Sequence, residues 1–225
     1  MFNLTQEWKS AFPGAHAGLL VLRGAANPAH HAGLEKQKVD LEKALREQYS
    51  GQDRGMLLEH PILKAYQEYY RRFKKTYHVQ LQLESLLFKG KSIPSVASLV
   101  EVMFMAEMKN LLLTAVHDLD AVQLPLVLDV TLGTERYQTL QGEAKTVKAG
   151  DMMISDRAGI VSNIIYGPDS RTQIRPETRD VVFTAYVPAG IDEATILNHL
   201  HDMETYVRVI APHAQTEVLQ VLGTD

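Results

Sequence analysis

The sequence predicts an α+β fold with helices in its first half, a mixed or antiparallel sheet in its second half and a closing helix. Three observations support this prediction. Before residue 118 most apolar residues recur at helical spacing, whereas after it the apolar runs are short, β-rich and separated by glycines. The chain has 225 residues, of which 45% are hydrophobic and 22% charged, and this composition is typical of a folded globular protein.

A strand and a helix are predicted at the start of the chain. Residues 18–23 (GLLVLR) form a short apolar run that Gly24 closes, which favours a buried strand. Residues 34–49 place apolar side chains on one helical face, and Ser50-Gly51 provides the stop signal. Residues 52–59 are polar and interrupted by glycine, so this stretch is the best linker candidate of the first half.

Three further helices are predicted before residue 118. His60-Pro61 opens the first, because proline is tolerated in the first turn of a helix. Its apolar stripe consists of Ile62, Tyr66, Tyr69, Tyr70 and Phe73. The second covers residues 83–88 and ends at Gly90, and the third runs from residues 93–95 to about Leu113. Charged residues interrupt the apolar stretch in this third segment, which therefore predicts a packed helix and not a membrane span.

Five short β-rich runs follow, and an amphipathic helix over residues 191–210 closes the chain. The predicted strands are residues 124–132, 136–140, 152–155, 160–165 and 181–187. The sequence contains no internal repeat and no low-complexity tract. We therefore interpret residues 1–225 as a single domain, with a helix-rich lobe over about 1–118 and a sheet-rich lobe over about 119–225.

Charge and composition exclude several functional classes. Lys and Arg number 23 and Asp and Glu 27, so the formal net charge is −4, which disfavours tight sequence-blind nucleic-acid binding. The lack of cysteine excludes disulfides, thiolate zinc sites, iron–sulfur clusters and cysteine nucleophiles. The sequence has no P-loop, dinucleotide-binding, zincin or serine-hydrolase motif. Its N-terminal segment lacks the pattern of a signal peptide, so a cytoplasmic location is expected.

The segment HDLD at residues 117–120 lies where the helical pattern gives way to the sheet. Its two aspartates are two residues apart and could bind a cation, or Asp118 could orient a partner residue. The alternative is a polar junction in which the aspartates accept hydrogen bonds from backbone amides. The sequence favours this alternative, because a metal ion would need several further oxygen ligands.

One concentration of basic residues stands out in this acidic chain. It consists of Arg71, Arg72, Lys74 and Lys75, joined by Lys89 and Lys91. If the two segments lie side by side, they could contact several phosphates of a nucleic acid without reading its sequence. The simpler interpretation is a solvated helix end.

The densest polar stretch covers residues 166–179, between two apolar strands, and a long loop in such a place is where a site can be built on a rigid scaffold. Arg171 could contact an anion. Glu177 could bind an α-ammonium group or align a water, while Asn163 and Tyr166 offer neutral hydrogen bonds. The alternative is a β-hairpin decorated with charges.

The order of several segments between His60 and about Pro188 matches that of a known family. The segments are HPILKAYQEYYRRF, LESLLFKGKSIPSVASLVEVM, LLLTAVHDLDAV, KAGDMMISDRAGIV and IYGPDSRTQIRPETRDVVFTAY. In this order the sequence resembles the tRNA-binding and editing domain of the phenylalanyl-tRNA synthetase beta subunit, in particular free-standing proteins that consist of this domain alone. The resemblance implies a three-layer α/β fold with a mixed β-sandwich and a pocket between two lobes.

The same resemblance implies a function. A free-standing editing protein binds tRNA or aminoacyl-tRNA and hydrolyses a mischarged aminoacyl ester, without a metal or other cofactor and without a DNA or membrane partner. The implied catalytic residues are Glu177, Asp118 and His117; the implied substrate contacts are Asn163, Tyr166, Arg171 and Thr178; and the implied RNA contacts are Arg71, Arg72, Lys74, Lys75, Lys89 and Lys91.

Ala115 stands where the synthetase domain usually has a histidine, and this departure keeps a second function open. The alternative is a non-catalytic module of the same fold that binds RNA or a free amino acid. A third possibility is that the fold serves an unrelated protein partner, because a shared fold does not fix function.

Overall fold

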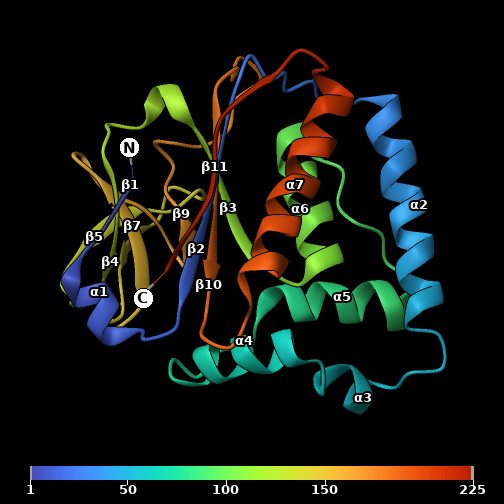
Figure 1. Ribbon diagram of the computed structural model, residues 1–225, viewed down its shortest axis with the longest axis horizontal. Helices are drawn as coiled ribbons and strands as arrows, with labels where there is room; N and C mark the ends of the chain where they lie inside the picture. Colours follow the sequence, from blue (N-terminus) through green and yellow to red (C-terminus); the bar gives the residue numbers. More distant parts are fainter. Residues whose placement is uncertain (1, 224–225) are drawn as a thin grey trace.

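The computed structural model describes residues 2–223, which form three main layers (Figure 1). A four-stranded sheet lies in the middle. Helices α6 (Ser98–Asn110) and α7 (Glu193–Ile210) cover one of its faces, and a five-stranded sheet covers the other. Helix α2 (Ala32–Gln48) packs on the outer side of α6 and α7. This arrangement confirms the predicted α+β class with a mixed β-sandwich.

The middle sheet is antiparallel throughout and has the order β11-β2-β10-β3. Its strands are β2 (His16–Arg23), β3 (Leu113–Asp118), β10 (Val181–Val187) and β11 (Gln215–Gly223). All seven residues of β10 are buried, because both faces of this central strand are covered. Strand β3, from the first half of the chain, pairs with β10, from the second half, so both halves contribute to one sheet.

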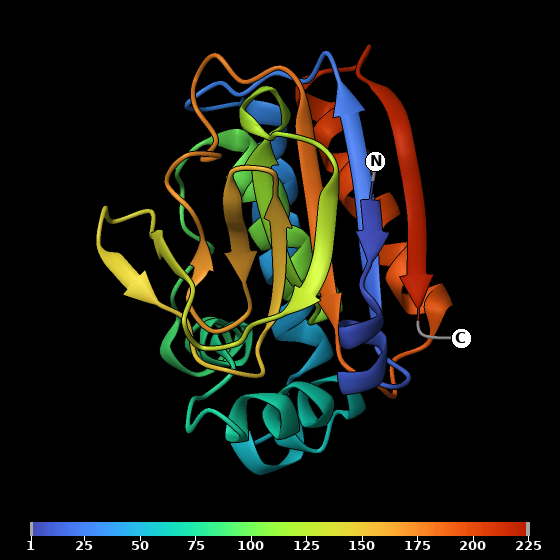
Figure 2. The ribbon, with the colours of Figure 1, turned by 90° about the vertical axis from the view of Figure 1, so that its left-hand side faces the viewer.

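The outer sheet is mixed, with the order β1-β4-β7-β8-β9. Its strands are β1 (Phe2–Leu4), β4 (Leu126–Val130), β7 (Met152–Asp156), β8 (Gly159–Asn163) and β9 (Gly167–Pro168). Strand β1 runs parallel to β4, and the other pairs are antiparallel. A separate hairpin of β5 (Arg136–Gln138) and β6 (Ala144–Thr146) projects beside this sheet, in yellow in Figure 2.

The remaining helices close the edges of the layers. α4 (Pro61–Arg71) and α5 (His78–Lys89) lie across one end of the sheets, with α3 (Arg54–Leu58) next to them (Figures 1 and 2). α1 (Gln6–Ala11) packs near β4, and a short 3-10 turn, η1 (Leu119–Ala121), follows β3. Among residues 2–223, no helix combines the length and the apolar character that crossing a bilayer would take.

Two predictions about the helical half of the chain were wrong, one about a linker and one about the end of a helix. The linker candidate at residues 52–59 contains α3, whose first turn is capped when the Asp53 carboxylate accepts a hydrogen bond from the Met56 amide at 2.8 Å. The third predicted helix ends at Asn110 and not at Leu113, because Leu111 adopts a left-handed conformation with φ 61°. Beyond that residue the apolar run continues as β3, and periodicity alone does not separate a buried strand from a buried helix.

One helix starts earlier than predicted, and several strands were not predicted. Helix α5 begins at His78, five residues before the predicted start at residue 83, and ends at Gly90 as predicted. Strand β11 follows the final helix and was not predicted; β1, β6 and β9 were also missed. These strands are short or lie at a sheet edge, where half-exposed side chains give a weak apolar signal.

A buried tyrosine joins α4 to the middle sheet. The Tyr66 hydroxyl donates to the Tyr186 carbonyl at 2.5 Å and accepts from the Leu113 amide at 2.9 Å. Its ring stacks on Tyr77 with centroids 4.2 Å apart, and the Tyr77 hydroxyl donates to the Leu111 carbonyl at 2.9 Å. These contacts fix the chain where α6 turns into β3, and the candidate site lies at that turn.

Candidate functional site

A cavity of about 480 Å³ lies between α6 and β3 on one side and residues 163–168 on the other. Its polar lining consists of His78, Glu107, Thr114, Asn163, Tyr166, Gln173 and Tyr186, and most of its other lining side chains are apolar. A volume of this size is within the range of small-molecule sites. The cavity is therefore large enough to enclose an amino-acid side chain.

One face of α6 forms a wall of this cavity. Val100, Met103, Phe104 and Glu107 follow the spacing i, i+3, i+4 and i+7, which places them on the same side of a helix. Three of the four are apolar, so Glu107 is a carboxyl group on an otherwise apolar wall.

The carboxyl group of Glu107 is almost completely shielded from solvent, with 1% of the residue exposed. Its Oε1 accepts a hydrogen bond from the Thr114 amide at 2.8 Å, while its Oε2 has no hydrogen-bond partner among residues 2–223. Burial raises the pKa of Glu107 to about 8, and the Thr114 amide opposes this shift without cancelling it. A carboxyl group that titrates near neutral pH in a cavity is suited to accept and return a proton.

The opposite wall carries two of the residues expected from the sequence. Asn163 is buried, and its Oδ1 accepts a hydrogen bond from the Tyr166 amide at 2.9 Å. Its amide nitrogen is buried beside the Tyr137 hydroxyl and has no hydrogen-bond partner of regular geometry among residues 2–223. The half-buried ring of Tyr166 lies 5.0 Å from the Lys145 ammonium group, which covers it as a cation–π contact.

The HDLD segment is a braced junction outside the cavity lining. Asp118 accepts hydrogen bonds from the Thr178 hydroxyl at 2.7 Å and from the Asp120 amide at 3.1 Å. His117 is fully buried, with Nδ1 2.9 Å from the Thr172 hydroxyl. Burial, with a smaller contribution from the positive charge of nearby Arg171, lowers the pKa of His117 to about 3, so the ring is neutral at physiological pH. The sequence had favoured this interpretation of the junction.

The polar loop is anchored to neighbouring elements through Arg171. Two nitrogens of Arg171 donate to the two carboxylate oxygens of Asp156, both at 2.9 Å, and one also donates to the Ala121 carbonyl at 2.8 Å. Glu177 is exposed, has no hydrogen bond or ion pair among residues 2–223 and does not line the cavity. The structure therefore brings Asn163 and Tyr166 to the cavity but not Arg171, Glu177 or the HDLD residues. The physical reasons differ, because Arg171 is bound to Asp156 of β7 and to η1, whereas Glu177 lies in solvent.

The basic residues fall into two separate groups. Arg71, Lys74 and Lys75 are exposed between α4 and the start of α5, whereas Lys89 and Lys91 are exposed at the C-terminal end of α5. The 12 residues of α5 span about 18 Å, so the two groups do not form one patch. Arg72, the last member of the basic cluster, donates a hydrogen bond to the Gly150 carbonyl at 3.1 Å. Its guanidinium carbon lies 5.3–5.6 Å from the centroids of three aromatic rings.

Comparison with known proteins identifies the family. The model of the B3/4 domain family matches residues 64–220. The chain belongs to the B3/4 domain family. No curated protein sequence matches it. Among solved structures, this B3/4 domain is similar to an N-terminal fragment of the phenylalanyl-tRNA synthetase beta subunit from Pyrococcus horikoshii, with a TM-score of 0.50 and 11% identity.

That similarity covers 93% of this chain and 48% of the synthetase fragment, so the B3/4 domain spans about half the length of its structural relative. The resemblance inferred from the order of sequence segments is thereby confirmed at the level of the fold. Within residues 2–223, no group of three or more His, Cys, Asp or Glu side chains is arranged to hold a metal ion.

Sequence reasoning missed Glu107 as a site residue. It treated the charges of this segment only as interruptions that argue against a membrane span. The available signal was that Glu107 shares a helical face with three apolar residues, which places a carboxyl group among buried neighbours.

Proposed function

We propose that this B3/4 domain binds the aminoacyl group of an aminoacyl-tRNA, or of a related aminoacyl ester, and hydrolyses the ester. The observation that carries the proposal is the buried carboxyl group of Glu107 on the wall of a largely apolar, amino-acid-sized cavity. Membership of the B3/4 family supports it, as does the similarity to a fragment of a tRNA synthetase subunit. The fold by itself does not fix the reaction.

In the proposed reaction, the ionised carboxyl group of Glu107 accepts a proton from a water molecule as the water oxygen bonds to the ester carbonyl carbon. The amide nitrogen of Asn163, which has no partner of its own, donates to the oxygen that becomes negatively charged. The acyl carbon–oxygen bond then breaks, and the proton passes from Glu107 to the ribose oxygen. The products are a free amino acid and a free ribose hydroxyl.

The proposal is tested with purified protein and a panel of misacylated tRNAs that includes small, aromatic and sulfur-containing amino acids. We expect deacylation above the buffer rate for at least one pair, and we expect Glu107→Gln to abolish it. Glu177→Gln should leave it unchanged, because Glu177 lies in solvent outside the cavity. The absence of deacylation across the panel would refute the enzyme, and a loss with Glu177→Gln alone would refute the assignment of Glu107.

A second candidate function is binding without catalysis. It is favoured by Ala115, a side chain on the cavity wall that bears no titratable group, and by the internal pairing of Asp118 and His117. A free amino acid that raises the melting temperature while no tRNA is deacylated would support this module over the enzyme.

A further inference from the structure

Strand β11 forms one edge of the middle sheet, and its outer side has no neighbouring strand. It pairs with β2 along its whole length and with no other strand among residues 2–223. Within the same range, none of its backbone groups is hydrogen-bonded to a loop or turn. Figure 2 shows β11, in red, as the outermost strand of the sheet. Alternate backbone N–H and C=O groups along this nine-residue strand therefore face outward without a protein partner.

The side chains of β11 lack the features that usually keep an exposed edge from pairing. Protected edge strands are short, or they carry lysine, proline or an inward-pointing charge. Residues 218–223 (VLQVLG) contain no proline and no charged residue. The aliphatic side chains of this segment are only half-buried, although three of them already contact the core. An edge of this composition is expected to pair with another strand.

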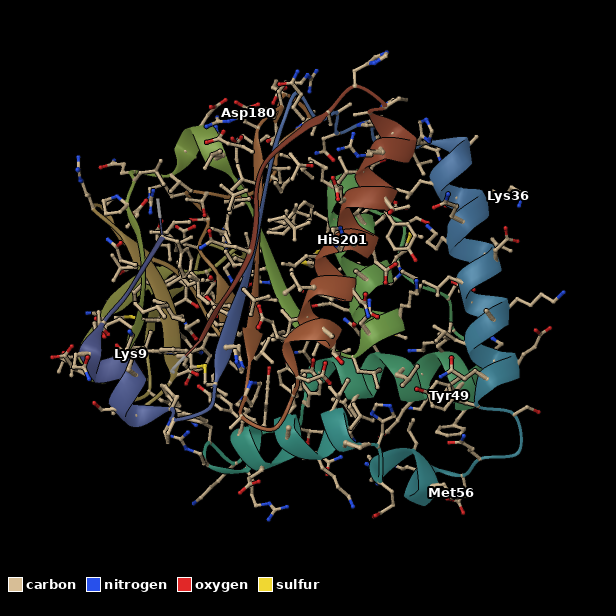
Figure 3. All side chains as sticks on the ribbon, viewed as in Figure 1. Lys9, Lys36, Tyr49, Met56, Asp180 and His201 are labelled. Atoms are coloured by element: carbon tan, nitrogen blue, oxygen red, sulfur yellow. The ribbon has the colours of Figure 1, made fainter. Side chains whose placement is uncertain are left out.

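The bulge and the charged residue of β11 both lie near its start. The register with β2 shifts between Thr216 and Val218, and the Glu217 carboxylate accepts a hydrogen bond from Arg23 at 2.5 Å. Arg23 also pairs with Asp180, which lies at this end of the sheet (Figure 3). These charges neutralise one another, so the regular, uncharged part of the edge begins after Glu217.

We propose that β11 pairs antiparallel with β11 of a second copy of this chain, about a two-fold axis beside Gln220. The pairing joins the two middle sheets into one continuous sheet. A strand edge that pairs antiparallel with its own copy is complementary to itself, so a closed dimer covers both exposed edges. The proposed dimer does not depend on the proposed function.

The side chains of β11 select the register of this pairing. An axis perpendicular to the sheet keeps the helix layers of both copies on one side, and residues on the same face of the strand then lie opposite each other. With Gln220 opposite the partner's Gln220, Val218 lies opposite the partner's Leu222 and Leu219 opposite the partner's Val221. A slip by two residues in either direction would place Gln220 opposite an aliphatic side chain. The proposed register instead lets the two glutamine amides hydrogen-bond to each other.

The helix layer is compatible with the same pairing. Helix α7 contacts both β2 and β11, which places its axis between these two strands. Because strands are about 4.8 Å apart, the α7 helices of the two copies would lie two strand spacings, or about 10 Å, from each other. Packed helices have axes about 8–10 Å apart. The dimer would therefore bury side chains of α7 as well as the edge of β11.

The experiment measures the mass of the full chain by sedimentation equilibrium over a wide range of concentrations. We expect the wild type to reach twice the mass of one chain. Gln220→Lys should weaken the dimer about tenfold or more, because it places two ammonium groups opposite each other. Gln220 is exposed in the single chain, so this variant should keep its fold, which urea unfolding checks. Gln215→Lys is the matched control, because Gln215 is an exposed glutamine of the same strand that lies before the bulge.

A mixture of two variants tests the position of the axis directly. Gln220→Lys and Gln220→Glu should each be largely monomeric alone, whereas an equimolar mixture should regain the mass of a dimer, because unlike charges then lie opposite each other. The chain has no cysteine, so Gln220→Cys provides a single reactive thiol per copy. A short bifunctional maleimide should cross-link this variant into a dimer and should leave Gln215→Cys as single chains.

A wild-type chain that stays monomeric at every concentration would overturn the proposal. A dimer that Gln220→Lys and Gln215→Lys weaken equally would also overturn it, because the interface would then lie elsewhere. The same conclusion would follow if the mixture of oppositely charged variants failed to regain the mass of a dimer.

Discussion

Replacing Glu107 by glutamine is expected to stabilise the protein increasingly as the pH rises. In the folded chain the pKa of Glu107 is about 8, against an ordinary value of 4.5, because burial disfavours the ionised carboxylate. The folded state therefore retains a proton that the unfolded state has released. Stability falls as the pH rises from about 4.5 to about 8, and glutamine, which does not titrate, removes this dependence.

The size of the effect follows from the two pKa values. At about 1.4 kcal/mol per pKa unit, the buried carboxyl group costs about 3 kcal/mol at pH 7 and up to about 5 kcal/mol well above pH 8. The glutamine oxygen can still accept the Thr114 amide hydrogen bond, but its NH₂ group would sit without a partner, at a cost of about 1–3 kcal/mol. This cost is independent of pH, so the change between pH 5 and pH 8, about 3–4 kcal/mol, is the diagnostic quantity.

The assay is urea unfolding of the wild type and of Glu107→Gln between pH 5 and pH 8. Trp8, the single tryptophan of the chain, is fully buried and provides the fluorescence signal. The free energies of unfolding of the two proteins should diverge with pH. If their pH profiles run parallel, Glu107 titrates at its ordinary pKa, and both its burial and its proposed role as a proton acceptor are refuted.

Three further predictions concern the reaction, the fold and the RNA. The buffer-corrected deacylation rate should rise about tenfold per pH unit below pH 8 and level off above it, because the ionised form of Glu107 is the active one. A rate that stays flat from pH 6 to pH 8 would contradict the role of Glu107 as the proton acceptor. Tyr66→Phe should lower the free energy of unfolding by about 2–4 kcal/mol, because it removes a hydroxyl that makes two buried hydrogen bonds. Tyr206→Phe is the control and should cost less than about 1 kcal/mol, because its hydroxyl makes no hydrogen bond among residues 2–223. Equal losses in urea unfolding would argue against the bridging role of Tyr66. The double variant Arg71→Gln, Lys75→Gln should reduce the slope of log K against log salt for tRNA binding by about 1.4–1.8, and an unchanged slope would remove this end of α4 from the RNA interface.

The sequence by itself determined the elements whose signals are local. Pro61 and the aromatic stripe that follows it fixed the start and the buried face of α4. Gly90 fixed the end of α5, and the β-rich run at residues 181–187 indicated the strand β10. The ordered segments between residues 60 and 188 were also sufficient to indicate the family that the comparisons confirm.

Only the tertiary structure decided which groups share a cavity. Glu107 and Glu177 are both carboxylates beside apolar segments, yet one is enclosed by α6, β3 and residues 163–168, and the other lies in solvent. Lys91 likewise lines a cavity beside α5 because Gly90 and a side chain of α2 hold its segment there. The chemistry of a titratable side chain depends on its solvation and its neighbours, and these come from segments distant in the chain, which no local pattern of residues encodes.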